Sequence, residues 1–409
     1  MTIPLSQPSI GEREIEYVAR VLRSGRLSQG PVLERFEERF AAYIGARYAV
    51  ATSSGTSALH LAVKALGIGP QDEVITTSFT FAASVNCLLY EGALPAFVDI
   101  DPPTLNLDPA QVREALARDY AWDRGCKRLI NRESGRILKA ILPVHVFGFP
   151  CAMAPLMETA REFNLRVLED ACEALGTEYR GRRAGALGDA GVFGFYPNKP
   201  ITTGEGGMVV TNDAQVAEVC RSLRNQGRDD DASWLRHTRL GYNYRLSDLH
   251  AAVGLAQLER IDELLEARER VAEQYSLALA DVQRILVPWN PPGAKRGWFV
   301  YPVRTRGPQA GALRDMLVAG LRARGIACQA YFPAIHLQPY FRQVPWSSRR
   351  PLPHTEIAAE RCLALPFFPG MNPEQVAQVC EAVRQGIAEA EQRLGTTKLR
   401  REEAARATG

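Results

Sequence analysis

The sequence predicts an α/β fold in which a mostly parallel sheet is covered by helices. From about residue 49 onwards, short β-branched or apolar runs alternate with longer amphipathic segments, an order typical of such a sheet. The chain has 409 residues, 46% of them apolar, and is long enough to bury a large core. Nowhere do 18 apolar residues follow one another, and no basic segment precedes an apolar run at the N-terminus. We therefore expect neither a membrane span nor a secretion signal.

Seven segments are expected to be strands, because they are short and rich in apolar or β-branched residues. They are residues 48–52, 73–77, 96–100, 138–147, 165–169, 191–195 and 208–211. Five segments between them have helical periodicity, namely residues 56–66, 84–91, 109–118, 154–163 and 214–225.

Two segments interrupt or end this alternation. Residues 118–139 are rich in Lys and Arg without a clear period, and we interpret them as a surface insertion. A long helical pattern at residues 246–279 is expected to contain the boundary to a second domain. We expect a large domain of residues 1–255, a smaller α+β domain of residues 256–390, and a charged tail of residues 391–409, with fraying from about residue 389.

The charge balance and the cysteines argue for a small-molecule partner in a reducing compartment. Lys and Arg number 49 and Asp and Glu 46, and a net charge of +3 predicts no binding to nucleic acid or to an anionic membrane. The eight cysteines contain no C-x-x-C pair, so we expect neither a disulfide framework nor a metal site. This pattern favours a cytoplasmic protein.

A turn of small residues is the first feature that carries chemistry. Ser54, Gly55 and Thr56 follow a predicted strand and open a predicted helix. Backbone N–H groups and hydroxyls there would face whatever lies over the helix N-terminus, which favours an anion such as phosphate. Ser and Thr are also ordinary helix caps, so simple capping is the alternative.

Two further residues complete a recognisable set. Asp170 ends an apolar strand, where open α/β sheets bind ligands, and could hold a protonated ring nitrogen; helix capping is the alternative. Lys199 lies in a turn before a Gly-rich segment, where a fixed amine could form a Schiff base; a solvated surface lysine is the alternative. An anion site, a strand-end acid and a turn lysine match what pyridoxal phosphate requires.

With these residues the sequence resembles the DegT/DnrJ/EryC1/StrS family of sugar aminotransferases, from Pro8 to about Arg384. This family is a branch of the fold-type I enzymes that use pyridoxal 5′-phosphate (PLP), with a large domain on a mostly parallel mixed sheet and a smaller α+β domain. The resemblance is carried by residues 25–31, 54–56, 69–75, 80–81, 97–100, 143–148, 169–171, 199–207 and 241–246.

The resemblance implies roles for single residues. Lys199 would form the internal aldimine, and Asp170 would pair with the pyridine nitrogen. Phe81 would stack on the cofactor ring. Asn243 would reach the phosphate of the neighbouring subunit, which implies a homodimer with shared active sites.

One departure concerns the phosphate. Gly55 and Thr56 would hold it, but Gly194 stands where many members of the family have a serine whose hydroxyl helps to bind it. The phosphate shell must then be completed differently, for example by Ser54 or Ser57.

The remaining candidates concern the substrate. Glu173 stands where many members have Gln or His and resembles perosamine-synthase-like 4-aminotransferases, with its carboxylate near the 3′-hydroxyl of the cofactor. A salt bridge at a helix start is the alternative. Tyr331 and His336 would contact the sugar, or else pack a turn. His145, in an apolar strand, is expected to be a hydrogen-bonded core residue.

We therefore expect transfer of an amino group from an amino acid, glutamate by resemblance, through the pyridoxamine form of the cofactor to a nucleotide-linked 4-keto-6-deoxy sugar. Such a product would serve polysaccharide or natural-product biosynthesis. A cyclitol ketone such as scyllo-inosose is the alternative acceptor, and a non-catalytic protein on the same fold is a third possibility. Positive potential for the nucleotide's phosphates is expected in the basic insertion, residues 118–139.

Overall fold

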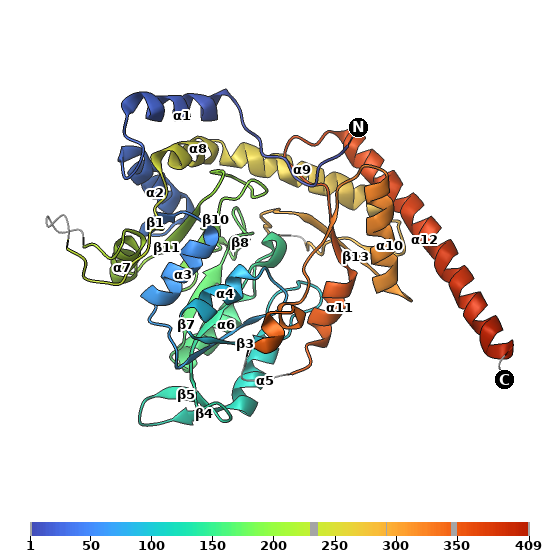
Figure 1. Ribbon diagram of the computed structural model, residues 1–409, viewed down its shortest axis with the longest axis horizontal. Helices are drawn as coiled ribbons and strands as arrows, with labels where there is room; N and C mark the ends of the chain where they lie inside the picture. Colours follow the sequence, from blue (N-terminus) through green and yellow to red (C-terminus); the bar gives the residue numbers. More distant parts are fainter. Residues whose placement is uncertain (1, 230–235, 292, 345–349, 408–409) are drawn as a thin grey trace.

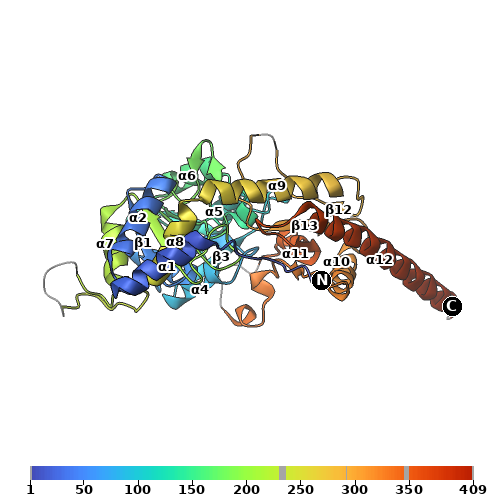
Figure 2. The same ribbon diagram turned by 90° about the horizontal axis from the view of Figure 1, so that it is seen from above.

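The computed structural model describes residues 2–229, 236–291, 293–344 and 350–407. Figure 1 shows a large sheet flanked by helices and a smaller second sheet beside it. Seen from above in Figure 2, the long helix α9 runs from one to the other, and α12 projects away from both. The predicted α/β class is confirmed.

The large sheet follows the order β1-β11-β10-β7-β6-β2-β3 along its main path. Its strands are β1 (Tyr48–Thr52), β2 (Asp72–Thr77), β3 (Leu94–Val98), β6 (Ile137–Leu142), β7 (Arg166–Asp170), β10 (Ala190–Gly194) and β11 (Gly207–Thr211). From β10 to β3 the neighbours are parallel, whereas β11 is antiparallel to both β1 and β10. The carboxyl ends of five parallel strands therefore lie at one edge.

Six of the seven predicted strands lie within two residues of the observed bounds, and the segment 138–147 is the exception. β6 ends at Leu142 because Pro143 has no N–H to donate to the ladder. The chain then turns through a short 3-10 helix, Val146–Gly148, in which Phe147 has a φ of 53°. This turn aims the backbone N–H of Phe147 at a carboxylate described below.

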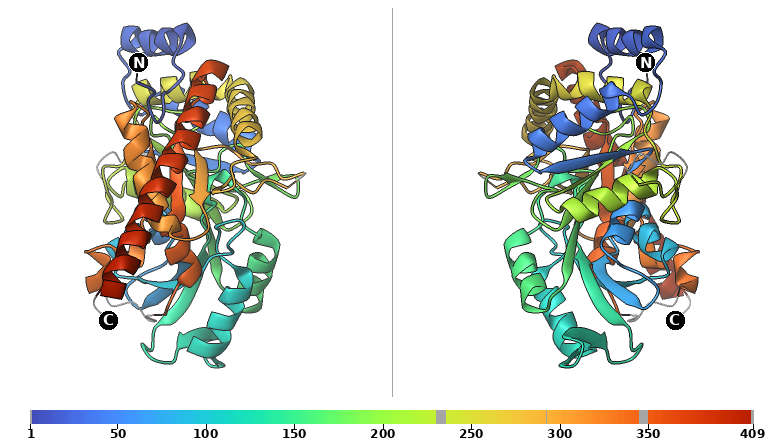
Figure 3. Two further views of the ribbon diagram at one scale, coloured as in Figure 1. Left: turned by 90° about the vertical axis from the view of Figure 1, so that its right-hand side faces the viewer. Right: turned by 90° about the vertical axis from the view of Figure 1, so that its left-hand side faces the viewer.

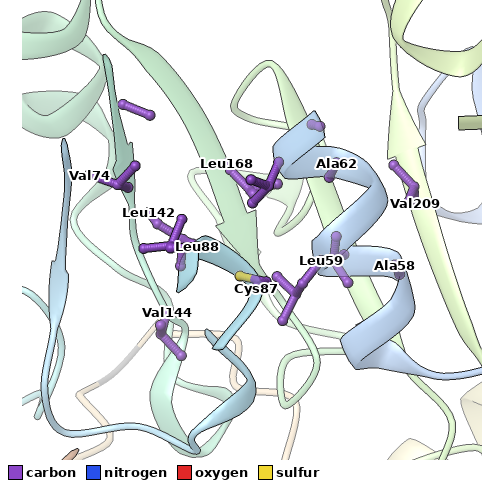
Figure 4. Close-up of a cluster of buried hydrophobic side chains, with 14 of the residues drawn as sticks. Ala58, Leu59, Ala62, Val74, Cys87, Leu88, Leu142, Val144, Leu168 and Val209 are labelled. Atoms are coloured by element: carbon purple, nitrogen blue, oxygen red, sulfur yellow. The ribbon is translucent and has the colours of Figure 1, made fainter. Parts of the chain in front are cut away.

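Helices cover both faces of this sheet, and all five predicted ones are present. One face is covered by α3 (Gly55–Ala65), α4 (Ala83–Tyr90) and α7 (Ala214–Arg224), the other by α2 (Pro31–Ile44), α5 (Pro109–Asp119), α6 (Met153–Glu162) and α8 (Asp248–Leu258). Along β11, Val209 packs on the first face, while Met208 and Val210 pack on the second, as the two-residue period of a strand requires. Figure 4 shows Leu59 of α3 in the first of these cores, with Cys87 and Leu168.

The expected helix at residues 246–279 is divided into α8 and α9 (Ile261–Leu279). Arg260 leaves the helical region with a φ of −122°. Its guanidinium donates to the carbonyl of Ser9, and the neighbouring Glu259 accepts from the hydroxyl of Tyr17, so the segment around α1 (Glu12–Ser24) fixes the break. No Gly or Pro marks this break in the sequence. We propose that it separates the two predicted domains.

The second sheet is antiparallel, in the order β12-β13-β15-β14. Its strands are β12 (Ile285–Leu286), β13 (Tyr301–Thr305), β14 (Gln329–Ala330) and β15 (Cys362–Leu365), and its helices are α9, α10 (Ala310–Ala323), α11 (Pro353–Arg361) and α12 (Pro373–Ala407). In the structure α12 continues through the predicted charged tail to Ala407, and fraying of this tail stays a prediction. Val379, Val383 and Ile387 anchor the first half of α12 in the core.

The basic insertion is a hairpin of β4 (Tyr120–Asp123) and β5 (Arg128–Asn131), with β5 paired to β6. It packs on Glu73 at the start of β2, a fully buried carboxylate that accepts from the hydroxyl of Tyr120 (2.8 Å) and the amide of Asn131 (3.0 Å). Figures 1 and 3 place the hairpin at the end of the molecule opposite α1. The insertion thus lies where the parallel strands begin, and the expectation that it supplies positive charge to a site at their carboxyl ends is wrong.

Within the described ranges, no helix is both long and apolar enough to cross a membrane.

Leu59→Ala is expected to lower the free energy of unfolding by about 3 kcal/mol, because Leu59 is 0% exposed and the change leaves a cavity among rigid elements. Leu277→Ala, at a position 79% exposed on α9, serves as the control and should cost less than about 1 kcal/mol. Urea unfolding of both variants measures the difference, and equal losses would contradict the packing described.

Candidate active site

The register of the sheet brings three of the predicted segments to one edge. Thr52, at the end of β1, is paired with Gly207, which is paired in turn with Gly194 at the end of β10. Val192 of β10 lies beside Asp170, the last residue of β7. The turn at Ser54, the strand end before Lys199, and Asp170 are therefore neighbours at the carboxyl edge, where open α/β sheets place their ligands.

The N-terminus of α3 is capped, and two of its backbone donors have no acceptor in the part of the chain that the structure describes. The Ser54 hydroxyl accepts from the backbone N–H of Ser57 (3.0 Å) and lies 2.8 Å from the Ser57 hydroxyl, so the predicted cap is present. The first bond of the helix runs from the N–H of Ala58 to the carbonyl of Ser54, which leaves the N–H groups of Gly55 and Thr56 ahead of it. Capping and anion binding are thus compatible here.

Small residues form a cradle around this turn. A Cβ on Gly207 would lie 2.3 Å from the carbonyl oxygen of Ser54, and one on Gly55 would lie 3.2 Å from both Cys172 Sγ and Gly194 Cα. The backbones of β11, β10 and the turn therefore approach closely only because side chains are absent. The backbone donors that this cradle presents are of the kind that bind a phosphate.

Asp170 is 5% exposed and is held by two neutral donors. Its Oδ2 accepts from the Ser84 hydroxyl (2.7 Å), and its Oδ1 accepts from the N–H of Cys172 (3.1 Å). The Ser84 hydroxyl lies 2.9 Å from the Thr80 hydroxyl. No helix begins at residue 171, so the capping alternative is wrong. Asp170 forms no ion pair within the described part of the chain, and it can accept a ring N–H as its charged partner.

Lys199 is not a surface lysine. Its side chain is 14% exposed, and Nζ lies 3.9 Å from Glu173 Oε1 and 3.7 Å from the centre of the Phe299 ring. Its backbone N–H donates to the carbonyl of Tyr196 (2.9 Å), and Pro200 follows it, so the backbone on this side is fixed as well. The amine is therefore held in a small site beside a carboxylate.

Glu173 is nearly buried, and its Oε2 accepts from the N–H of Phe147 (2.9 Å). Burial raises the pKa of Glu173 to about 7; the charge of Lys199 and the hydrogen bond from Phe147 oppose this rise, and Asp170 adds to it. Residues 171–177 form no helix, so the helix start of the alternative is absent, whereas an ion pair of Glu173 is present with Lys199 as its partner. Glu173 faces Lys199, and its carboxyl can hold or release a proton near neutral pH.

The three remaining predicted residues, His145, His336 and Tyr331, lie in three different surroundings. His145 is buried, with Nε2 3.0 Å from Glu169 Oε2 and Nδ1 accepting from the N–H of Cys151, so the predicted core role is confirmed. His336 Nδ1 lies 2.7 Å from the Ser78 hydroxyl just after β2, the arrangement expected for turn packing. Burial and the charge of Glu173 raise the pKa of Tyr331, which therefore lies near the site.

Phe81 and Asn243 lie on the surface of the single chain. Phe81 is 64% exposed, directly after Thr80, whose hydroxyl contacts Ser84 and so belongs to the surroundings of Asp170. Asn243 is exposed, and the carbonyl of the adjacent Tyr244 accepts from the N–H of Ser53. Both are positioned for partners outside the isolated chain, and their roles stay predictions.

Three residues of the site escape the sequence patterns. Ser84 is the first residue of a predicted helix, and nothing in the sequence marks its hydroxyl as a partner of Asp170; Thr80, whose hydroxyl lies 2.9 Å away, precedes α4. Phe299, whose ring lies against the side chain of Lys199, precedes β13. Arg268, which donates to the carbonyl of Lys199, lies in α9. No local signal marks either of them.

The comparisons with known proteins agree with this geometry. Residues 8–384 match the DegT/DnrJ/EryC1/StrS aminotransferase family. The chain belongs to this family. The predicted resemblance, the enzyme class and the use of PLP are thereby confirmed.

Three members of the family show how far the similarity extends. GDP-perosamine synthase from Caulobacter vibrioides is 39% identical over 94% of this chain and 98% of that protein. The spore coat polysaccharide biosynthesis protein SpsC from Bacillus subtilis is 36% identical over 93% and 96%. DesV from S. venezuelae, solved in complex with a ketimine intermediate, is 36% identical over 94% and 98%, with a TM-score of 0.82.

The side chains and backbone groups of this site fit PLP by their chemistry. The cradle at Gly55 offers backbone donors to a phosphate, and Lys199 offers an enclosed amine. Asp170 offers a carboxylate that has no cationic partner among the described residues. Among the residues described, no group of three or more side chains could hold a metal ion.

Glu173→Gln is expected to stabilise the cofactor-free protein at pH 8 and to change little at pH 5. The pKa of Glu173 rises from 4.5 to about 7 on folding, so the folded state binds more protons in this window and stability falls as the pH rises through it. Gln removes the buried charge and keeps an oxygen for the N–H of Phe147. The gain at pH 8 is up to about 3 kcal/mol, measured by urea unfolding. Glu38→Gln, at an exposed position, is the control; an equal effect of Glu173→Gln at both pH values would contradict the shift.

Gly194→Ser is expected to tighten PLP binding by about threefold to tenfold, the worth of one added hydrogen bond. A Cβ at Gly194 would lie 3.6 Å from Cys172 Sγ and 3.7 Å from Gly55 Cα, ordinary contact distances, so the serine fits. Gly194→Ala supplies the Cβ without the hydroxyl and should bind PLP like the native protein. Equilibrium dialysis of PLP measures both, and a serine no better than alanine would argue against a phosphate beside Gly194.

Proposed function

We propose that this enzyme transfers the amino group of glutamate to the keto carbon of a nucleotide-linked 4-keto-6-deoxy sugar. The observation that carries this proposal is the enclosure of Lys199 Nζ beside Glu173, close to Asp170 at the end of β7. The similarity to GDP-perosamine synthase, together with a glutamate at position 173, supports a nucleotide sugar as the acceptor.

The roles proposed for the cofactor-binding residues follow from their positions. The N–H groups of Gly55 and Thr56, with the hydroxyls of Ser54 and Ser57, would bind the phosphate at the positive end of the α3 dipole. Asp170 would accept the proton of the ring nitrogen and hold it there, because an opposite charge at short range favours the protonated ring.

The side chains around Lys199 would perform the proton transfers. PLP, when bound, supplies an electron sink for the carbon that carries the amino group. Lys199 Nζ, freed by the incoming amine, would move the proton between the substrate Cα and the C4′ position. Glu173, whose pKa is about 7, would hold or release a proton beside that amine. Tyr331 and His336 are proposed contacts of the sugar, of which Tyr331 has the stronger support because it lies near Glu173.

A second copy of the chain would complete the site. Three large apolar side chains are exposed, namely Phe81 (64%), Tyr196 (54%) and Leu240 (85%). Phe81 follows Thr80, and the carbonyl of Tyr196 accepts from the N–H of Lys199, so both residues adjoin the site. A second subunit that covered these side chains would remove their apolar surface from water. We propose a homodimer in which Asn243 of one subunit reaches the phosphate of the other and Phe81 lies on the cofactor ring. The eight unpaired cysteines support a cytoplasmic location.

Lys199→Ala tests the central assignment. The native protein, incubated with PLP, should show the absorbance of lysine-bound cofactor and lose it when glutamate donates its amine. Lys199→Ala should abolish both changes and lower the turnover by at least about a thousandfold, because the covalent attachment and the proton transfer are lost together. A native protein that stays colourless with PLP would refute the assignment.

A panel of dTDP-, UDP- and GDP-linked 4-keto and 3-keto sugars, with scyllo-inosose as the cyclitol, then identifies the acceptor.

A further inference from the structure

Arg268, in the middle of α9, is a fully buried cation without an acidic partner. Its side chain is among the largest that are fully buried, and in the described chain it pairs with no carboxylate. Burial alone lowers the pKa of Arg268 to about 9, so the group stays charged at neutral pH. A buried charge that is satisfied only by neutral acceptors costs free energy, and apolar replacements are often more stable. Such a cost points to a task other than stability.

The acceptors of Arg268 show what that task is. Nη2 donates to the carbonyl of Lys199 (3.1 Å), and Nη1 donates to the carbonyls of Trp298 (3.4 Å) and Phe299 (3.2 Å). The ring of Phe299 in turn lies 3.7 Å from Lys199 Nζ. One guanidinium therefore fixes the backbone at the base of the lysine and the backbone of the residue whose ring lies against its amine.

Arg296 provides a comparison within the same layer. It is also a buried guanidinium, and burial lowers its pKa to about 9 as well. It packs on the rings of Phe149 (4.8 Å) and Trp298 (4.7 Å), and no contact to Lys199 is seen within the described residues. Both guanidinium groups are buried beside aromatic rings, that of Arg268 beside Phe367 (5.5 Å), and they differ in the link to Lys199.

We propose that Arg268 is a positioning residue for Lys199. Arg268 holds the lysine amine between Phe299 and Glu173, in the direction required for attack on the carbonyl carbon of PLP. Arg268 touches neither cofactor nor substrate in this proposal and acts through the lysine. The inference rests on the proposed role of Lys199.

The test measures attachment of the cofactor rather than turnover. Cofactor-free protein is mixed with PLP, and the absorbance of lysine-bound cofactor is followed in a stopped-flow instrument. Arg268→Met should slow this step by at least about tenfold, because a displaced nucleophile loses its alignment. Arg268→Lys, which keeps a donor, should recover most of the rate, and Arg296→Met, the matched control, should stay within about twofold of the native protein.

A second measurement separates positioning from general binding. In a Lys199→Ala background, where the cofactor binds only by its non-covalent contacts, adding Arg268→Met should leave the dissociation constant of PLP unchanged within about twofold. An Arg268→Met protein that attaches PLP at the native rate would overturn the proposal. An Arg296→Met protein that attaches PLP as slowly as Arg268→Met would also overturn it. So would a dissociation constant of PLP that is more than about twofold larger in the double variant than in Lys199→Ala.

Phe299→Leu carries the test if Arg268→Met does not fold. Leucine keeps apolar volume at this buried position and removes the ring next to Lys199 Nζ, so attachment should slow by at least about threefold. An unchanged rate would contradict the proposed link. A native protein without lysine-bound cofactor would instead refute the role of Lys199 itself, which keeps the two failures apart.

Discussion

The burial of acidic side chains at the carboxyl edge of the parallel strands is the constraint on which the rest of the structure depends. Glu169 is fully buried in β7, and its Oε1 accepts from the N–H groups of Leu187 and Gly188, both at 2.7 Å. Its Oε2 accepts from the N–H of Gly185 (2.9 Å) and contacts His145 Nε2 (3.0 Å). Removing these donors would leave an unpaired charge in the core, so the loops that supply them are held against the sheet.

This constraint also determines the environment of Asp170. Because successive side chains of a strand point to opposite faces, Glu169 and Asp170 address different partners although they are adjacent. His145 Nδ1 accepts from the N–H of Cys151, so the ring donates its proton from Nε2 to Glu169. Backbone N–H groups and His145 satisfy Glu169, whereas among the described residues Asp170 receives only neutral donors, Ser84 and Cys172. One acid therefore serves the fold, and its neighbour remains available for a cation.

The site brings the amine of Lys199 together with the carboxylates of Asp170 and Glu173, and all three side chains are largely buried. Asp170 raises the pKa of Glu173 and Lys199 lowers it, and burial outweighs both. A group that titrates close to neutrality between two charged neighbours can adjust the net charge of the site as a cation arrives or leaves. Membership of the aminotransferase family gives this arrangement a purpose, since amino transfer requires protons to be moved and returned at the same place.

What the sequence by itself determined depends on neighbours along the chain. The alternation of strands and helices, the cap at Ser54, the strand-end position of Asp170 and the turn around Lys199 are all local patterns, and each is found where it was expected. The tertiary structure alone decided which distant groups meet them. Ser84 lies 86 residues from Asp170 and Arg268 lies 69 residues from Lys199, and the basic insertion lies at the far edge of the sheet because Glu73 buries its charge there. The physical reason is that capping and periodicity act over one helical turn, whereas the partners of a buried charge are selected by packing.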